Sequence, residues 1–170
     1  WNHPSNRGHR IAGLGRAMAF QLRGRVLRRR TLARLGDRSH LWAELHRTAS
    51  SRAVYGNPPD WAEMLTWKRL IEPGDVFIDV GANVGAYSVY LSELGASVEA
   101  IEPHREALER LRENVELNGS DVRVHAAVAA DRRGRLRITP DRDDMNHVVA
   151  QGGLEVDAIA IDDLLASRAA

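Results

Sequence analysis

The 170-residue chain contains no cysteine. That absence excludes disulfide bonds, zinc–thiolate sites and a cysteine nucleophile, and it agrees with the reducing cytoplasm, where we expect the protein. No apolar run approaches the roughly eighteen residues of a membrane-spanning helix, and arginines interrupt every early apolar run. We therefore expect neither a transmembrane segment nor a secretory signal. Hydrophobic residues make up 44% of the chain, which is enough for one globular core.

Lysine is also scarce, since Lys68 is the single lysine among 24 basic residues. The net charge of +1 hides an asymmetry along the chain. Residues 1–40 carry ten arginines and one acid, whereas residues 41–170 carry fourteen basic and twenty-two acidic residues. The two parts differ in kind, and we predict two units. Residues 1–59 form a basic, largely helical N-terminal segment, and residues 60–170 form a separate domain.

Aromatic residues are few, and Phe20 is the only one between Trp1 and Trp42. The basic segment therefore lacks the interleaved aromatics that would favour a nucleic-acid partner, and we do not expect one. Binding to an anionic membrane surface stays open. Two further roles for the basic helix also stay open: covering the second domain, or contacting a partner protein.

Apolar residues recur at helical spacing from Ile11 to Leu35, with arginines at the other positions. This spacing predicts a basic amphipathic helix that is interrupted or kinked near Gly24. A second short helix is predicted at 40–48. After a turn that contains two prolines, a third is predicted at 61–71.

From residue 76 the pattern changes to alternating strands and helices. Short β-branched runs at 76–80, 97–101 and 122–129 predict three strands, the first buried on both faces. Helices are predicted at 86–94 and 103–117, with Pro103 in the first turn of the second. This alternation predicts an α/β fold with a Rossmann-like, mostly parallel sheet and flanking helices, preceded by the basic helical segment.

The C-terminal part has a weaker pattern. Residues 136–139 and 148–150 are predicted to form a hairpin or edge strands, residues 156–161 a further strand, and a helix or turn begins at Asp162. An acidic group between them is interpreted as a solvated loop rather than a site for a hard cation, so no metal is predicted. Its members are Asp141, Asp143, Asp144, Asn146 and His147. A segment that closes over a cofactor is the alternative interpretation.

The first predicted strand runs directly into the loop Asp79-Val-Gly-Ala-Asn-Val-Gly85, at the sheet edge where parallel sheets bind ligands. Gly81 lets a ligand approach the backbone closely. Asn83 is a common non-glycine residue in the left-handed conformation, and Gly85 lets the next helix begin near the strand. Asp79 would repel a pyrophosphate and suits a cation, such as the ammonium of an amino acid. A structural role, capping the loop's amides, is equally open for Asp79.

Glu102 ends the second predicted strand, twenty-one residues after Gly81. That spacing suits a carboxylate that accepts hydrogen bonds from both hydroxyls of a ribose. At the end of the third strand, the small side chains of Ala126 and Ala127 leave room for an adenine. Ribose, adenine and a cationic amino acid without phosphate describe S-adenosylmethionine, which we predict as the cofactor.

With these residues in view, the chain resembles a class I S-adenosylmethionine-dependent methyltransferase and, more narrowly, the FkbM family. The resemblance extends from about Trp61 to Leu165 and is carried by "FIDVGANVGAYS", "IEPH", "ELNG", "HAAVAADRRG" and "VDAIAIDDLL", in the family's order. It adds Tyr87, Ser88 and Pro103 to the predicted cofactor-binding residues. It implies an enzyme that O-methylates a hydroxyl on a sugar, polyketide or other small molecule, and it leaves the general base unassigned.

Family members continue beyond "IDDLL" into a further strand that pairs with the first. The resemblance therefore implies that this chain holds the cofactor-binding half of a methyltransferase, with residues 76–80 at an unprotected sheet edge. A homo-oligomer or a completing chain is then a candidate partner. Three alternatives stay open: a domain that only binds the cofactor, a nucleic-acid methyltransferase that uses the arginine-rich segment, and a nicotinamide-dependent oxidoreductase. Asp79 and the absent middle glycine argue against the last.

Overall fold

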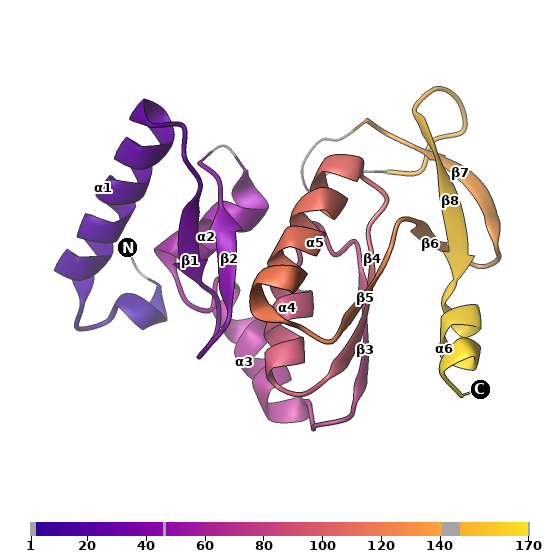
Figure 1. The fold of residues 1–170 in the computed structure, drawn as a ribbon, viewed down its shortest axis with the longest axis horizontal. Coiled ribbons are helices and arrows are strands. Elements are labelled where there is room, and N and C mark those ends of the chain that lie inside the picture. Colours follow the sequence, from indigo (N-terminus) through magenta and orange to yellow (C-terminus); the bar gives the residue numbers. More distant parts are fainter. Residues whose placement is uncertain (1–2, 46, 141–146, 170) are drawn as a thin grey trace.

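The computed structural model describes residues 3–45, 47–140 and 147–169 (Figure 1). Its N-terminal elements are a 3-10 helix (Pro4–Asn6), α1 (Arg10–Val26), β1 (Thr31–Arg34), β2 (His40–Ala43), α2 (Thr48–Tyr55) and α3 (Trp61–Leu70). The central elements are β3 (Val76–Val80), α4 (Ala86–Glu93), β4 (Ser97–Ile101), α5 (Arg105–Asn118) and β5 (Val122–His125). The C-terminal elements are β6 (Val128–Ala130), β7 (Gly134–Ile138), β8 (Leu154–Ala160) and α6 (Ile161–Ala169).

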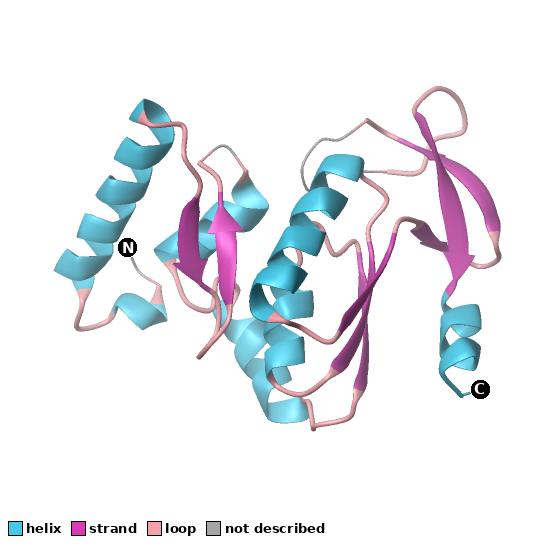
Figure 2. Cartoon of the chain, viewed as in Figure 1, coloured by secondary structure: helices cyan, strands magenta, loops and turns pink. Residues whose placement is uncertain are grey.

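Strands β3, β4 and β5 form a parallel sheet in that order, with α4 and α5 as its crossover helices (Figures 1 and 2). Both helices cover one face of the sheet, because Val98 packs in a cluster with residues of α4 and Ala100 packs with Leu108 and Leu111 of α5. Helix α6 covers the other face, where Leu164 packs against Ile101. The predicted α/β, Rossmann-like fold is therefore confirmed.

The predicted third strand at 122–129 is interrupted at Ala126 and Ala127. Strand β5 pairs with β4, but β6 belongs to a separate sheet, in which it runs parallel to β8, and β8 runs antiparallel to β7. Ala127 is buried beside Ile101, so the chain turns across the end of β4 instead of following it. The strand and helix predicted near the C-terminus are confirmed as β8 and α6. Of the predicted hairpin, β7 forms, and a single bridge joins Ile138 to Val148.

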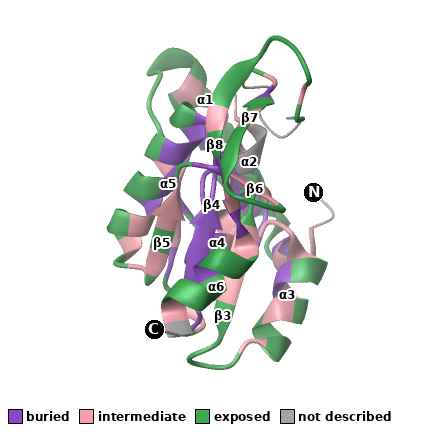
Figure 3. Cartoon of the chain, turned by 90° about the vertical axis from the view of Figure 1, so that its right-hand side faces the viewer, coloured by how far each residue is buried: buried purple, intermediate pink, exposed green. Residues whose placement is uncertain are grey.

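The prediction that the first strand is buried on both faces is wrong. Val76 and Val80, at the two ends of β3, are 45% and 53% exposed. Within the part of the chain that the structure describes, β3 pairs with β4 alone, so one of its edges has no neighbour. The buried strand is β4, which lies between two strands and two layers of helix (Figure 3).

The N-terminal segment begins with the predicted basic helix, but α1 ends at Val26 rather than near Leu35. Two residues later Arg28 adopts a left-handed backbone conformation, with φ of 48°, which turns the chain away from the helix axis. The apolar residues that follow then continue in a strand.

The short helix predicted at 40–48 is wrong, because residues 40–43 form β2. Strands β1 and β2 make an antiparallel hairpin in which Thr31 lies opposite Ala43. Leu41 and Ala43 are fully buried while the alternate residues are less so. This period-two burial comes from packing on both sides of the hairpin, and it outweighs the helical spacing of the sequence.

The outer edge of β2 is paired by two asparagine side chains of α5 rather than by another strand. The amide of Asn118 accepts from the N–H of His40 at 2.8 Å and donates to the C=O of His40 at 2.9 Å. One turn earlier, Asn114 accepts from the N–H of Trp42 at 3.0 Å. Because these asparagines are four residues apart, they lie on one face of α5 and present their amides at strand spacing. They join the N-terminal segment to the parallel sheet.

We expect Asn114→Ala to lower the free energy of unfolding by about 2–4 kcal/mol, since the N–H of Trp42 and the C=O of Val84 lose a buried partner together. Chemical denaturation followed by circular dichroism measures the change. Glu116→Ala, at an exposed position of the same helix, is the control and should change stability by less than about 0.5 kcal/mol. Equal stabilities for the two variants would contradict this role for Asn114.

Candidate functional site

The loop between β3 and α4 turns the chain within five residues, three of which have positive φ. The φ angles are 77° at Gly81, 49° at Asn83 and 86° at Gly85. The left-handed conformation predicted for Asn83 is therefore confirmed. The N–H groups of Gly81 and Ala82 both donate to the carbonyl oxygen of Ile101, at 2.9 and 3.1 Å, and attach the loop to the end of β4.

Glycine is required at positions 81 and 85 of this loop for two different structural reasons. A Cβ at Gly81 would meet no atom within 4 Å, so this part of the backbone faces open space. A Cβ at Gly85 would lie 2.5 Å from Cδ1 of Leu111, so glycine here lets α5 pack against the start of α4. Gly81 is thus the position at which a ligand can reach the loop backbone.

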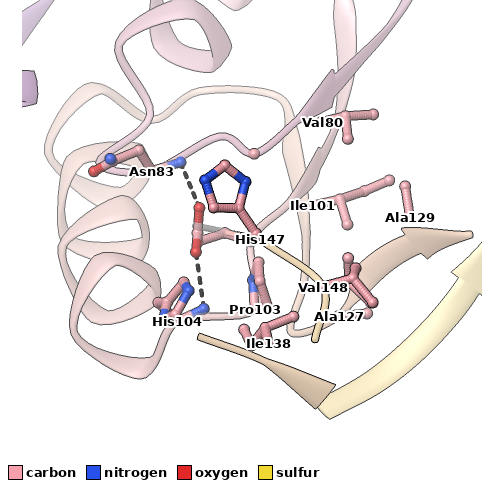
Figure 4. Close-up of a pocket in the computed structure, with 13 residues that line it drawn as sticks. Val80, Asn83, Ile101, Pro103, His104, Ala127, Ala129, Ile138, His147 and Val148 are labelled. Carbon is pink, nitrogen blue, oxygen red and sulfur yellow. Dashed lines mark hydrogen bonds between the residues drawn. The ribbon is translucent and has the colours of Figure 1, made fainter. Parts of the chain in front are cut away.

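Glu102 follows β4 directly and is only 4% exposed. Its Oε2 accepts a hydrogen bond from the N–H of Asn83 and its Oε1 accepts one from the N–H of His104, both at 2.8 Å (Figure 4). One carboxylate therefore fixes the glycine loop relative to the start of α5. The prediction that Pro103 lies in the first helical turn is wrong. Helix α5 begins at Arg105, and His104 is its N-cap residue.

A pocket of about 290 Å³ opens beside this loop, at the carboxyl ends of β3 and β4 (Figure 4). Its polar side is formed by Gly81, Asn83, Glu102, His104 and His147. Its apolar side is formed by Val80, Ile101, Ala127, Ala129, Ile138 and Val148. The volume lies near the lower end of the range for small-molecule sites, about 300–1,000 Å³, which suits one nucleoside better than a dinucleotide.

Half of the ten predicted cofactor-binding residues line this pocket: Gly81, Asn83, Glu102, Pro103 and Ala127. The other five do not: Asp79, Gly85, Tyr87, Ser88 and Ala126. Gly85 contacts α5 instead, and Ala126 is exposed at the bend between β5 and β6.

Asp79 points from β3 toward the first turn of α4. The hydroxyl of Ser88, which is fully buried, donates to Oδ2 of Asp79 at 2.5 Å. Burial raises the pKa of Asp79 above its ordinary value, although hydrogen bonds from Ser88 partly offset this effect. The N-cap of α4 is Gly85, which has no side chain, so Asp79 supplies the polar partner at this helix start. The structure thus gives Asp79 a structural contact, one of the two roles that the sequence left open.

Tyr87 lies outside the pocket, on the side of α4 that faces α3. Its hydroxyl donates to Oε2 of Glu63 at 2.6 Å. Burial, together with this hydrogen bond to an acidic acceptor, raises the pKa of Tyr87. This contact joins α4 to α3.

Several lining residues were not predicted as site residues. His104 follows Pro103 in the "IEPH" stretch, and its position after Glu102 is a signal that the sequence offered. Ile138 and Val148 reach the pocket because β7 and the segment after residue 146 form an antiparallel bridge, and no local pattern marks that pairing. Nε2 of His104 is buried without a hydrogen-bond partner among the described residues, which is unusual beside a pocket unless a polar ligand group completes it.

Within residues 3–45, 47–140 and 147–169, no three acidic or histidine side chains are grouped so that they would hold a metal ion. The acidic group that was interpreted as a solvated loop lies outside the described residues, apart from His147. In the same part of the chain, no helix has the length and apolar character needed to cross a membrane.

No family model matches the chain, so membership of the FkbM family stays a prediction. Over 69 residues the chain is 35% identical to ribosomal protein L11 methyltransferase from Thermotoga neapolitana, and this match covers 40% of the chain and 26% of that protein. The chain thus spans about a quarter of the length of this curated relative.

Two solved methyltransferases are similar over larger parts of the chain. One is the Pyrococcus abyssi tRNA (uracil-54, C5)-methyltransferase in complex with S-adenosyl-L-homocysteine, with a TM-score of 0.46, 22% identity, and coverage of 60% of this chain and 24% of that one. The other is an S-adenosylmethionine-dependent methyltransferase from Agrobacterium tumefaciens, with a TM-score of 0.48, 15% identity, and coverage of 59% and 33%.

We expect Asp79→Asn to fold at least as stably as the unaltered chain at pH 7, with a gain of up to about 2 kcal/mol. Because the pKa of Asp79 is raised in the folded chain, the ionised carboxylate destabilises the fold at pH values above that raised pKa. The difference between the two proteins should therefore vanish as the pH falls below the ordinary value of 3.8. The asparagine oxygen still accepts from Ser88.

Urea denaturation at several pH values measures this difference. The control is Asp131→Asn, at an exposed position. A large loss of stability in Asp79→Asn at pH 7 would show that the charge of Asp79 supports the fold.

Proposed function

We propose that the pocket beside the glycine loop binds S-adenosylmethionine and that the chain is the cofactor-binding part of a methyltransferase. The observation that carries this proposal is the buried carboxylate of Glu102, which lines the pocket and is oriented by two backbone N–H groups. The sequence similarity to ribosomal protein L11 methyltransferase supports it.

Glu102 suits a pair of ligand hydroxyls. The N–H groups of Asn83 and His104 orient its two carboxylate oxygens, and a carboxylate can accept more hydrogen bonds than these two. A buried carboxylate favours further donors strongly, since the low dielectric around it makes each charge-assisted hydrogen bond stronger. The 2′ and 3′ hydroxyls of a ribose supply two such donors at adjacent positions.

The rest of the pocket suits a nucleoside without phosphates. No arginine or lysine lines it among the described residues, so a pyrophosphate would have no cation to pair with. This argues for S-adenosylmethionine over a nicotinamide dinucleotide. Ala127 and Ala129 offer a small, apolar wall for an adenine, and Nε2 of His104 offers a hydrogen-bonding group.

When bound, S-adenosylmethionine supplies an activated methyl group, so the chain mainly has to bind, orient and exclude water. In this proposal Glu102 holds the ribose, and Gly81 lets the cofactor approach the loop. Asp79 lies outside the pocket lining, so its negative charge acts on the cationic amino-acid part without direct contact. None of these residues is assigned as a general base.

The methyl acceptor is a separate part of the proposal. O-methylation of a small-molecule hydroxyl follows from the resemblance to the FkbM family, while the name of the curated relative gives a ribosomal protein as its substrate. A cytoplasmic location and a homo-oligomer or completing chain belong to the same proposal. The division of the chain into an N-terminal segment, residues 1–59, and a methyltransferase domain, residues 60–170, is also part of it.

The test is calorimetric titration of the chain with S-adenosylhomocysteine, with NAD as the control ligand. We expect saturable binding of S-adenosylhomocysteine alone. Absence of that binding, in a chain that circular dichroism shows to be folded, would contradict the proposal, as would equal binding of NAD.

Glu102→Ala should weaken binding by about 100-fold or more, since two charge-assisted hydrogen bonds are lost. Because Glu102 also orients the loop, the variant's thermal stability is measured alongside. Asp79→Asn, expected to remain stable, should weaken binding by roughly tenfold if its charge attracts the ammonium. Glu116→Ala is exposed and should bind normally. Near-normal affinity in Glu102→Ala would refute the ribose assignment.

A further inference from the structure

Helix α1 packs against the rest of the protein with one narrow face of small residues and one aromatic ring. Gly13, Ala17 and Phe20 are its buried residues. A Cβ at Gly24 would lie 2.7 Å from Cβ of Leu45, so the same face continues to the last turns. These positions are three or four residues apart and form one face of the helix.

The opposite face of α1 carries a second apolar row, which we call the outer stripe. It consists of residues spaced three or four apart: Ile11, Leu14, Met18, Leu22 and Val26. Their exposed fractions are 89%, 45%, 63%, 63% and 67%. The row extends for about 22 Å at 1.5 Å per residue. Five large apolar side chains in one exposed row form a patch that soluble monomers rarely leave uncovered.

The charges around the outer stripe have one sign. Residues 3–36 contain nine arginines and no acid. Arg10, Arg16, Arg23 and Arg25 lie on α1 itself, and Arg28 to Arg30 follow its end. Within the described chain, Arg25, Arg28 and Arg29 form no ion pair. The partner that covers the stripe must therefore be apolar in the middle and negative around it.

We infer that α1 docks this protein on an anionic lipid bilayer surface. A helix with an exposed apolar row flanked by arginines lies in the interface, with the row among the acyl chains and the guanidinium groups at the lipid phosphates. Helix α1 is also the outermost element at one end of the molecule, so a flat surface can approach it without meeting another element (Figure 1). The candidate pocket, formed at β3, β4 and β7, lies toward the other end.

Two other occupants fit the charges and the shape less well. A second copy of the chain would bring two sets of arginines together with no acid from this segment to pair them. A nucleic acid would pair with the arginines but leave the outer stripe uncovered, because its negative exterior offers no apolar surface.

The test is flotation of the full 170-residue chain with vesicles. Equimolar phosphatidylglycerol and phosphatidylcholine should carry the chain upward at about 0.1 M salt, and phosphatidylcholine alone should not. Raising the salt to about 1 M should release much of it, since screening weakens the arginine contacts.

Two leucine variants separate the outer stripe from general surface hydrophobicity. Leu22→Glu changes the stripe, and Leu70→Glu is the matched control on α3, with exposed fractions of 63% and 61% in the unaltered chain. Leu22→Glu should reduce vesicle binding by roughly tenfold or more, whereas Leu70→Glu should bind as the unaltered chain does. Circular dichroism checks that both variants fold.

The inference is overturned if the folded chain does not float with anionic vesicles, or if the two variants bind equally. It is also overturned if sedimentation shows a dimer that Leu22→Glu dissociates, while vesicles do not bind. That result would make the stripe a contact between copies. If the chain binds RNA and does not bind vesicles, the arginines belong to a nucleic-acid site instead.

Discussion

The contacts of Asn114 join three parts of this protein that are distant in sequence. Its side chain is 1% exposed, accepts from the N–H of Trp42 in β2, and donates to the C=O of Val84 in the glycine loop at 2.8 Å. The hairpin, the crossover helix α5 and the candidate site therefore share one buried amide. A buried polar group destabilises the fold unless it is hydrogen-bonded. The amide of Asn114 is fully paired only when the hairpin, α5 and the glycine loop are all in place.

Two acidic side chains, one buried and one partly buried, perform a similar task elsewhere in the fold. Glu99 on β4 is 1% exposed, and the Nε of Arg168 on α6 lies 2.5 Å from its carboxylate, so this pair attaches α6 to the sheet. Glu93 of α4 accepts from the N–H groups of Asp37, Arg38 and Ser39, each at 2.9 Å, and holds the tip of the hairpin. Burial alone would raise the pKa of Glu93, but the hydrogen bonds from residues 37–39 lower it overall.

The molecule has a different chemistry at each end. The N-terminal end presents arginines and an exposed apolar row on α1. The other end contains a small pocket whose described lining includes a buried carboxylate and no basic residue other than histidine. The proposed docking on an anionic surface depends on the first end alone, where the arginines flank the exposed apolar row.

Local sequence patterns were sufficient for the parallel sheet and its glycine loop. Strands β3 and β4 and the helices between and after them follow from β-branched runs, stop signals and spacing, and the left-handed Asn83 follows from its place between two glycines. Those features depend on residues close together in the chain. What the sequence determined about the candidate site was accordingly the part contributed by the ends of consecutive strands: Gly81, Asn83 and Glu102.

Tertiary contacts decided the rest. Residues 40–43 form a strand because α5 supplies asparagines to its edge, and helical spacing alone could not reveal that partner. The third predicted strand bends at Ala126 because Ala127 is buried against Ile101, and β6 then pairs with β8 about thirty residues later. Asp79 turned toward Ser88 rather than the pocket, and Ile138 and Val148 entered it, through pairings that only the folded chain brings together.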